Sequence, residues 1–180
     1  MDYVSTRNSS NIFKFKDVFI KGLADDGGLF IPKSLQKYKK NDLFEFKNLE
    51  YKELAKKIIH PFIGNFMSEN DLSKIVDKSY SVFRKKNVVD LIKIGDRSVL
   101  ELFHGPTLAF KDIGAKFMAS CLDHFKDSYT SKKITVLVAT SGDTGGAVAK
   151  GFSNTKDIDV CILYPKGKIS EVQEKQITTN

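Results

Sequence analysis

The residues that could bind an anion form a glycine-rich turn, Ala139–Ala147, with the sequence ATSGDTGGA. It stands between an apolar, β-branched run and a segment of small residues, a pattern that predicts a strand, a turn and a helix. Backbone N–H groups at the start of such a helix can bind a phosphate or a carboxylate. Ser141 and Thr144 would add hydroxyl donors. The turn could equally be a connection capped by Ser141 or Asp143, with no ligand.

A second reactive segment, His104–Asp112, has the sequence HGPTLAFKD and contains Lys111 among apolar neighbours. We expect Lys111 at the start of a helix, whose partial positive charge opposes a further positive charge. A lysine amine that loses its proton readily can form a Schiff base or act as acid and base. Because the chain has 26 lysines among its 29 basic residues, a solvated surface role for Lys111 is the competing interpretation.

Other chemistries lack their sequence patterns. The turn is neither GxGxxG nor GxxxxGK[ST], and Ala139 excludes a GxSxG nucleophile. The histidines have no HExxH spacing and the two cysteines form no CxxC pair, so we predict no metal site. Asp25 and Asp26 could form a metal-binding or acid pair, although Gly27 and Gly28 beside them favour a turn.

Residues 1–86 are predicted to form a small, mainly helical N-terminal domain. Apolar residues at helical spacing begin at Tyr51, and Pro61 should end that helix near His60. Ser68 begins a capping-box pattern before a second helix. A linker is expected at Arg84–Asn87.

Residues 87–180 are predicted to alternate between strands and helices. An apolar run at 134–139, the glycine-rich turn, a helix over 144–152 and a strand over 159–164 make one βαβ unit. Further strands are expected at 88–94 and 98–103, and an amphipathic helix between them and the unit. We therefore predict an α/β fold with a mostly parallel sheet, flanking helices and a buried strand at 134–139.

Composition narrows the class of protein. The chain has 180 residues, 41% of them hydrophobic and 28% charged, which is typical of a globular protein. No apolar run reaches the roughly 20 residues that a membrane-spanning helix needs. No secretory signal is recognised at the N-terminus, so we expect a cytoplasmic protein without membrane contact, and two buried thiols.

The net charge of +7 admits a second class, a non-catalytic, lysine-rich protein that binds nucleic acid. Only three of the 29 basic residues are arginine, whereas phosphate and base recognition favours arginine. No basic stripe is interleaved with aromatic residues. Lysines on solvated helix faces are the favoured interpretation, and no nucleic-acid partner is expected.

Several segments together closely resemble the N-terminal portion of the threonine synthases. The likeness covers nearly all of the chain, in the order of the family. The segments that carry it are Tyr3–Arg7, Gly22–Pro32, His104–Asp112, Ala139–Gly145, Tyr164–Ser170 and Gln173–Gln176.

The resemblance implies a pyridoxal-phosphate enzyme of the tryptophan-synthase-β-like fold, incomplete in this chain. It implies that Lys111 holds pyridoxal 5'-phosphate as an internal aldimine, and that Ser141, Gly142, Asp143 and Thr144 lie beside the cofactor and the substrate anions. In related enzymes the residue matching Asp143 lies near the phenolic oxygen of the cofactor. The implied reaction converts O-phospho-L-homoserine and water to L-threonine and phosphate, the last step of threonine biosynthesis.

Two further expectations follow from the resemblance. A threonine-synthase-like phospho-lyase would use the same fold and cofactor but stop at elimination, releasing a keto acid and ammonia. Members of the family are longer, and the glycine-rich loop that cradles the cofactor phosphate is not found here. We therefore expect an N-terminal fragment, with 87–180 as the first part of the catalytic domain.

Overall fold

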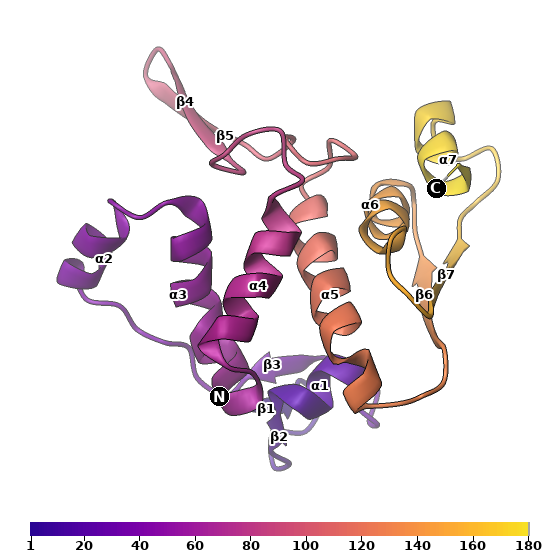
Figure 1. The fold of residues 1–180 in the computed structure, drawn as a ribbon, viewed down its shortest axis with the longest axis horizontal. Helices are drawn as coiled ribbons and strands as arrows, with labels where there is room; N and C mark the ends of the chain where they lie inside the picture. Colours follow the sequence, from indigo (N-terminus) through magenta and orange to yellow (C-terminus); the bar gives the residue numbers. More distant parts are fainter. Residues whose placement is uncertain (180) are drawn as a thin grey trace. The chain divides into compact units, whose positions relative to one another are not determined.

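Residues 1–179 are described by a computed structural model, shown in Figure 1. The chain divides into two compact units, Met1–Lys74 and a second unit from Ile75 onward. Each unit is described by itself. Within the described residues, no helix is both long and apolar enough to cross a membrane.

The first unit contains a small antiparallel sheet. Its central strand β1 (Asp2–Ser5) pairs with β2 (Phe13–Lys14) on one side and with β3 (Phe30–Pro32) on the other. Tyr3 and Val4 of β1 are buried. The tyrosine hydroxyl donates a hydrogen bond to the carbonyl oxygen of Phe62 at 2.8 Å, which joins the sheet to a helix.

The other elements of the first unit are helical, with one helix between β2 and β3 and the others after β3. They are α1 (Phe15–Lys21), α2 (Lys40–Phe46), α3 (Tyr51–Ile63), the 3-10 turn η1 (Gly64–Phe66) and the first turns of α4 (Glu69–Tyr80). As predicted, Ser68 begins α4, because its hydroxyl accepts a hydrogen bond from the Asp71 N–H at 3.1 Å. The apolar face of α4 is buried at Leu72, Ile75, Val76 and Tyr80.

The predicted end of α3 at His60 is wrong, because the helix continues through Pro61 to Ile63. Proline removes one helical hydrogen bond and its ring crowds the carbonyl group four residues earlier, which is unfavourable inside a helix. Ile63 is buried with 3% of its surface exposed, and the hydrophobic gain of that burial offsets the lost bond. Gly64 then ends the helix by donating its N–H to the His60 carbonyl.

The second unit begins, after α4, with a hairpin of β4 (Asp90–Ile94) and β5 (Arg97–Glu101). Two long helices follow in the sequence, α5 (Asp112–Phe125) and α6 (Asp143–Phe152), with the 3-10 turn η2 (Lys126–Ser128) after α5. The two helices pack closely because α6 carries small residues: a Cβ at Gly151 would lie 3.3 Å from the Ala115 carbonyl oxygen.

The predicted βαβ unit is confirmed. Strands β6 (Ile134–Ala139) and β7 (Ile158–Leu163) are parallel, and α6 connects them. The final helix α7 (Glu171–Thr178) begins at the capping residue Ser170. Figure 1 shows α6 beside this strand pair and next to α7, and these elements are in contact.

The prediction of a mostly parallel sheet requires correction. The described residues form two antiparallel sheets and one parallel pair. The connection between β4 and β5 is too short for parallel pairing, which needs a crossover of about a dozen residues or more. Strand β6 is not buried throughout but alternates, and Leu137 is 68% exposed. Helix α6 covers one face of the pair, so alternate side chains face away from it. Cys161 of β7 is exposed for the same reason, contrary to prediction.

Candidate functional site

Two of the predicted site residues, Lys111 and Thr144, line one cavity of about 540 Å³. Its walls come from the end of the loop before α5, from α5 and from α6; the lining residues are Phe110, Lys111, Ile113, Gly114, Ala115, Met118, Thr144, Ala147 and Val148. The lining is mainly apolar with few polar groups, which is typical of a site for a small organic molecule. The packing of α5 on α6 therefore brings together two residues that are 33 positions apart (144 minus 111).

Lys111 immediately precedes α5 and is half-buried. Its backbone carbonyl accepts a hydrogen bond from the Ala115 N–H at 2.9 Å, so the residue already follows the helical path. Its amino group lies 4.4 Å from the centre of the Phe110 ring. This cation–π contact orients the amine while leaving its lone pair usable whenever the proton is lost.

Asp112 fixes the loop that carries Lys111. It is buried, with 1% of its surface exposed, and its carboxyl oxygens accept two hydrogen bonds from Thr107. The backbone N–H donates at 2.8 Å and the hydroxyl at 2.7 Å. A Cβ at Gly105 would overlap with the Asp112 side chain, so glycine is required for this close approach. Asp112 was not among the predicted site residues, although an acidic residue in the first turn of a helix is a recognised signal.

Thr140, rather than Ser141 or Asp143, caps α6. Its hydroxyl oxygen accepts hydrogen bonds from the N–H groups of Gly142 and Gly145, both at 3.0 Å. Gly142 has a φ of +136°, which favours glycine. Fewer backbone N–H groups than expected are therefore available to bind an anion, because those of Gly142 and Gly145 already have an acceptor within the turn.

The remaining predicted residues lie next to the cavity rather than in its wall. Ser141 is exposed, and Asp143 accepts a hydrogen bond from Gln173 of α7 at 2.7 Å. Gly142 is buried against the same glutamine. Five residues were predicted for one site. The structure places two of them in the cavity lining, two in the turn before α6, and Asp143 at the first position of α6.

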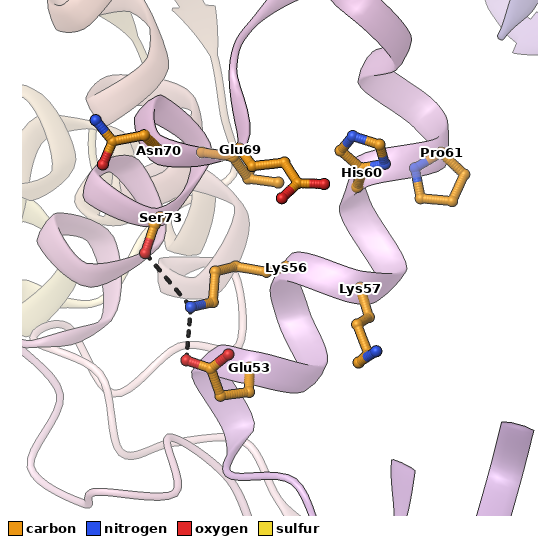
Figure 2. Close-up of a pocket in the computed structure, with 9 residues that line it drawn as sticks. Glu53, Lys56, Lys57, His60, Pro61, Glu69, Asn70 and Ser73 are labelled. Atoms are coloured by element: carbon orange, nitrogen blue, oxygen red, sulfur yellow. Dashed lines mark hydrogen bonds and ion pairs between the residues drawn. The ribbon is translucent and has the colours of Figure 1, made fainter. Parts of the chain in front are cut away.

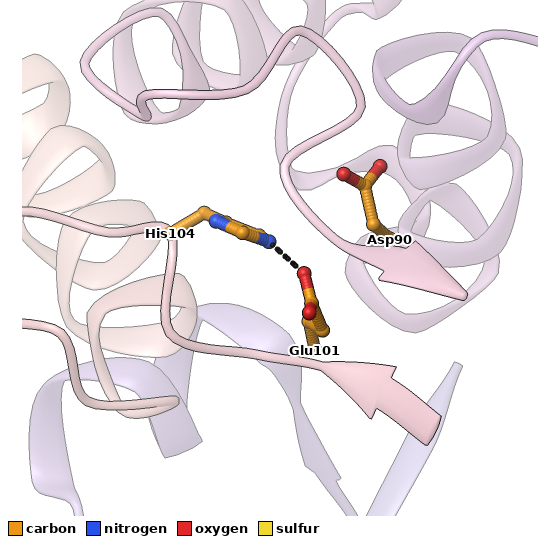
Figure 3. Close-up of side chains that lie close together, drawn as sticks. All are labelled: Asp90, Glu101 and His104. Carbon is orange, nitrogen blue, oxygen red and sulfur yellow. Dashed lines mark hydrogen bonds and ion pairs between the residues drawn. The ribbon is translucent and has the colours of Figure 1, made fainter. Parts of the chain in front are cut away.

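Asp90, Glu101 and His104 form a cluster that spacing along the chain did not reveal (Figure 3). The His104 Nε2 atom lies 2.9 Å from a Glu101 carboxyl oxygen, and Lys85 lies 3.0 Å from a carboxyl oxygen of Asp90. Mainly through this hydrogen bond, Lys85 lowers the pKa of Asp90 below its ordinary value. The carboxylates thus already have cationic or N–H partners, which join the hairpin to the segment containing His104.

A second cavity of about 540 Å³ lies in the first unit, between α3 and α4 (Figure 2). Lys56 reaches across it, with its amino group 2.5 Å from Glu53 and 3.4 Å from the Ser73 hydroxyl. Figure 2 shows that these side chains come from both helices. Of these two contacts only the one with Ser73 joins α3 to α4, because Glu53 and Lys56 both belong to α3.

The paired aspartates of the first unit form a turn, as favoured by the sequence. A carboxyl oxygen of Asp26 accepts hydrogen bonds from the Ser5 hydroxyl at 2.7 Å and the Gly28 N–H at 2.8 Å. These bonds lower the pKa of Asp26, and the bond from Ser5 has the largest effect. Arg7 donates to the Asp26 carbonyl at 3.1 Å. Two of the segments that carry the family resemblance are therefore joined to each other in the structure.

Comparisons with known proteins show what the chain is similar to. A family model described as the threonine synthase N terminus matches residues 2–80. Threonine synthase of Pseudomonas aeruginosa is 38% identical over 180 residues, covering 99% of this chain and 38% of that protein. Mouse threonine synthase-like 2 is also 38% identical, covering 99% of this chain and 37% of that protein.

A solved structure shows the same arrangement of the chain. The crystal structure of PLP-bound threonine synthase from Brucella melitensis matches with a TM-score of 0.88 and 36% identity. The match covers 98% of this chain and 38% of that structure. The chain thus spans a little over a third of the length of these relatives.

Proposed function

The chain belongs to the threonine synthase family and corresponds to the N-terminal part of its members, and we propose on this premise that the complete protein makes L-threonine. The reaction is the conversion of O-phospho-L-homoserine and water to L-threonine and phosphate, with pyridoxal 5'-phosphate as cofactor. The observation that carries the proposal is the shared cavity of Lys111 and Thr144, formed by the two segments with the most specific resemblance.

The residues of this cavity fit the cofactor. A primary amine stands in a mainly apolar cavity of about 540 Å³, within the range of about 300–1,000 Å³ that small-molecule sites occupy. Lys111 would hold the cofactor through a covalent bond to Nζ, and Ser141, Gly142, Asp143 and Thr144 would lie along its edge. When bound, pyridoxal phosphate supplies an electron sink that stabilises a carbanion beside the substrate nitrogen.

The other contributions come from the chain itself. The Lys111 amine would remove a proton from the substrate α-carbon and later return it. Phe110 and Met118 line the cavity, where they would exclude water from the amine. The Thr144 hydroxyl can donate a hydrogen bond to an anionic group. These roles need the loop of Lys111 to be rigid, which the bonds between Asp112 and Thr107 provide.

The two parts of the chain would have different roles in the complete protein. Residues 1–86 would form the N-terminal domain of the family type, and 87–180 the first part of the α/β catalytic domain with one wall of the active site. Because the chain spans 38% of the length of its bacterial relative, the activity is assigned to the complete protein.

Covalent trapping tests the cofactor assignment. The 180-residue chain and the complete protein are incubated with pyridoxal phosphate, reduced with borohydride, digested and mapped by mass spectrometry. We expect selective labelling of Lys111 in the complete protein, loss of that label in Lys111→Arg, and its retention in Lys116→Arg, a matched lysine of α5. Labels scattered over surface lysines of the complete protein would contradict the assignment.

A second candidate function is a phospho-lyase with the same cofactor, favoured by the similarity to threonine synthase-like 2. It would release a keto acid and ammonia instead of threonine. The complete protein is incubated with O-phospho-L-homoserine, and threonine, keto acid and phosphate are quantified. Threonine equal to the phosphate released supports the synthase, whereas keto acid equal to phosphate supports the lyase.

A further inference from the structure

Helix α7 contacts both loops that lead into the cavity helices. Its two glutamines are three residues apart and therefore lie on neighbouring turns of one face. The Gln173 side chain donates to an Asp143 carboxyl oxygen at 2.7 Å, and the Gln176 side chain donates to the Thr107 carbonyl at 3.2 Å. Asp143 begins α6, and Thr107 belongs to the loop before α5.

The orientation of the Gln173 amide is fixed by the start of its own helix. Its carbonyl oxygen accepts from the Ser170 N–H at 3.1 Å, and its backbone N–H donates to the Ser170 hydroxyl at 3.3 Å. This capping box leaves the amide NH₂ group to face Asp143. The approach is close, because a Cβ at Gly142 would lie 2.6 Å from the Gln173 amide carbon.

Gln176 completes the connection to the other loop. Thr107 is already bound to Asp112 through its N–H and hydroxyl, and Gln176 takes the one remaining backbone group of that residue. The Gln176 side chain also packs against α6, since a Cβ at Gly146 would lie 3.1 Å from its amide oxygen. The loop containing Thr107 is therefore held from α5 and from α7.

We propose that Gln173 and Gln176 are positioning residues that fix the two loops of the cofactor site relative to each other. The proposal rests on the proposed function for the identity of the bound cofactor. Gln173 holds the Asp143 carboxylate in one orientation, and Gln176 holds the loop that carries Lys111. The Lys111 amine and the Asp143 carboxylate come from different elements and need such support, because small displacements of reacting groups lower the reaction rate strongly.

Gln173→Glu isolates the contact with Asp143. The substitution keeps an oxygen for the Ser170 N–H, removes the donor to Asp143, and sets two carboxylates against each other. Gln176→Met removes the donor to Thr107 at similar side-chain length. Lys175→Gln, at an exposed position between them, is the matched control. All variants are made in the complete protein.

Amide hydrogen exchange of the cofactor-free protein is the first measurement. In Gln173→Glu we expect exchange over residues 140–146 to accelerate by about tenfold or more, since a hydrogen bond to a charged group is lost. In Gln176→Met the acceleration is expected over 105–110. Asp143→Asn combined with Gln173→Glu would reverse the direction of the hydrogen bond and restore slow exchange at 140–146. Exchange equal to that of Lys175→Gln in both single variants would overturn the proposal.

The visible absorption spectrum after addition of pyridoxal phosphate is the second measurement. In Gln173→Glu we expect a changed ratio of the cofactor absorption bands, whereas a purely structural defect would reduce all bands in proportion and would likewise overturn the proposal. If the wild-type protein binds no cofactor at Lys111, the proposed function fails. The exchange rates then still decide whether α7 fixes the loops.

Discussion

Thr107 and Asp112 are joined by two hydrogen bonds, from the backbone N–H and the hydroxyl of Thr107 to the two carboxyl oxygens of Asp112, at 2.8 and 2.7 Å. The carboxyl group is almost wholly buried. Its effect is to fold the five-residue connection so that Lys111 enters α5 in one defined place. A buried pair of this kind determines loop geometry because neither partner can exchange its bonds for water.

Replacement of Asp112 therefore has a large predicted cost. Asp112→Ala leaves both Thr107 donors without their acceptor, and we expect the free energy of unfolding to fall by about 3 kcal/mol. Thr107→Val removes only the hydroxyl bond and should cost about 1 kcal/mol. Urea denaturation of the 180-residue chain, followed by circular dichroism, gives both values. Equal costs for the two variants would contradict the assignment.

Thr140 is predicted to be the residue that stabilises the start of α6. Thr140→Val keeps the shape but removes the acceptor of two N–H groups, so we expect a loss of about 2 kcal/mol. Thr140→Ser keeps the hydroxyl and should lose less than half of that. Ser141→Ala should change stability by no more than about 0.5 kcal/mol. A larger effect at Ser141 than at Thr140, in thermal or urea unfolding, would show that the cap is wrongly assigned.

The two cysteines should differ in reactivity, and Cys121 should make the stability of the fold depend on pH above 9.0. Burial raises the pKa of Cys121 to about 12, from 9.0, while Cys161 is exposed. Since the folded pKa is raised, the stabilisation is complete below pH 9.0 and is lost as pH rises toward 12. Between these pH values, the free energy of unfolding of Cys121→Ala should therefore fall less than that of the wild type, as measured by urea denaturation.

Alkylation checks the same assignment at neutral pH. Iodoacetamide should modify Cys161 in the native chain and reach Cys121 only in urea, as read by intact mass and peptide mapping. Rapid modification of Cys121 in the native chain would mean that its environment is not the one described.

The turn at Asp26 gives a prediction for the first unit. A Cβ at Gly28 would overlap with the Ser5 hydroxyl, so Gly28→Ala should break the bond from Ser5 to Asp26 and lower the unfolding midpoint. In a Ser5→Ala background the same change should cost much less, because the overlapping oxygen is absent. Additive costs in this double-mutant cycle would contradict the contact.

The pH dependence of this turn follows from the lowered pKa of Asp26, chiefly a consequence of the Ser5 hydrogen bond. A lowered folded pKa gives stabilisation that is present above the ordinary value of 3.8 and disappears as pH falls through the folded value. Acid unfolding of Ser5→Ala should therefore show a weaker pH dependence below about pH 4 than the wild type.

Local sequence signals were sufficient for several elements from Tyr51 onward, but not for the small sheet of β1, β2 and β3. The capping pattern at Ser68 and the βαβ pattern at 134–164 each predicted elements that the structure contains. These signals depend on neighbours within a few residues, and local hydrogen bonding and hydrophobic periodicity decide such elements. The end of α3 was mispredicted because the burial of Ile63, a tertiary effect, outweighed the local cost of Pro61.

The sequence by itself indicated the family and predicted Lys111 and the glycine-rich turn as site residues, because such predictions rest on residue type and order. Only the tertiary structure decided that Lys111 and Thr144 share a cavity, and that α7 reaches both Asp143 and Thr107. Each of these depends on contacts between residues distant in the chain. Such contacts form when helices and strands pack, and no local pattern encodes their geometry.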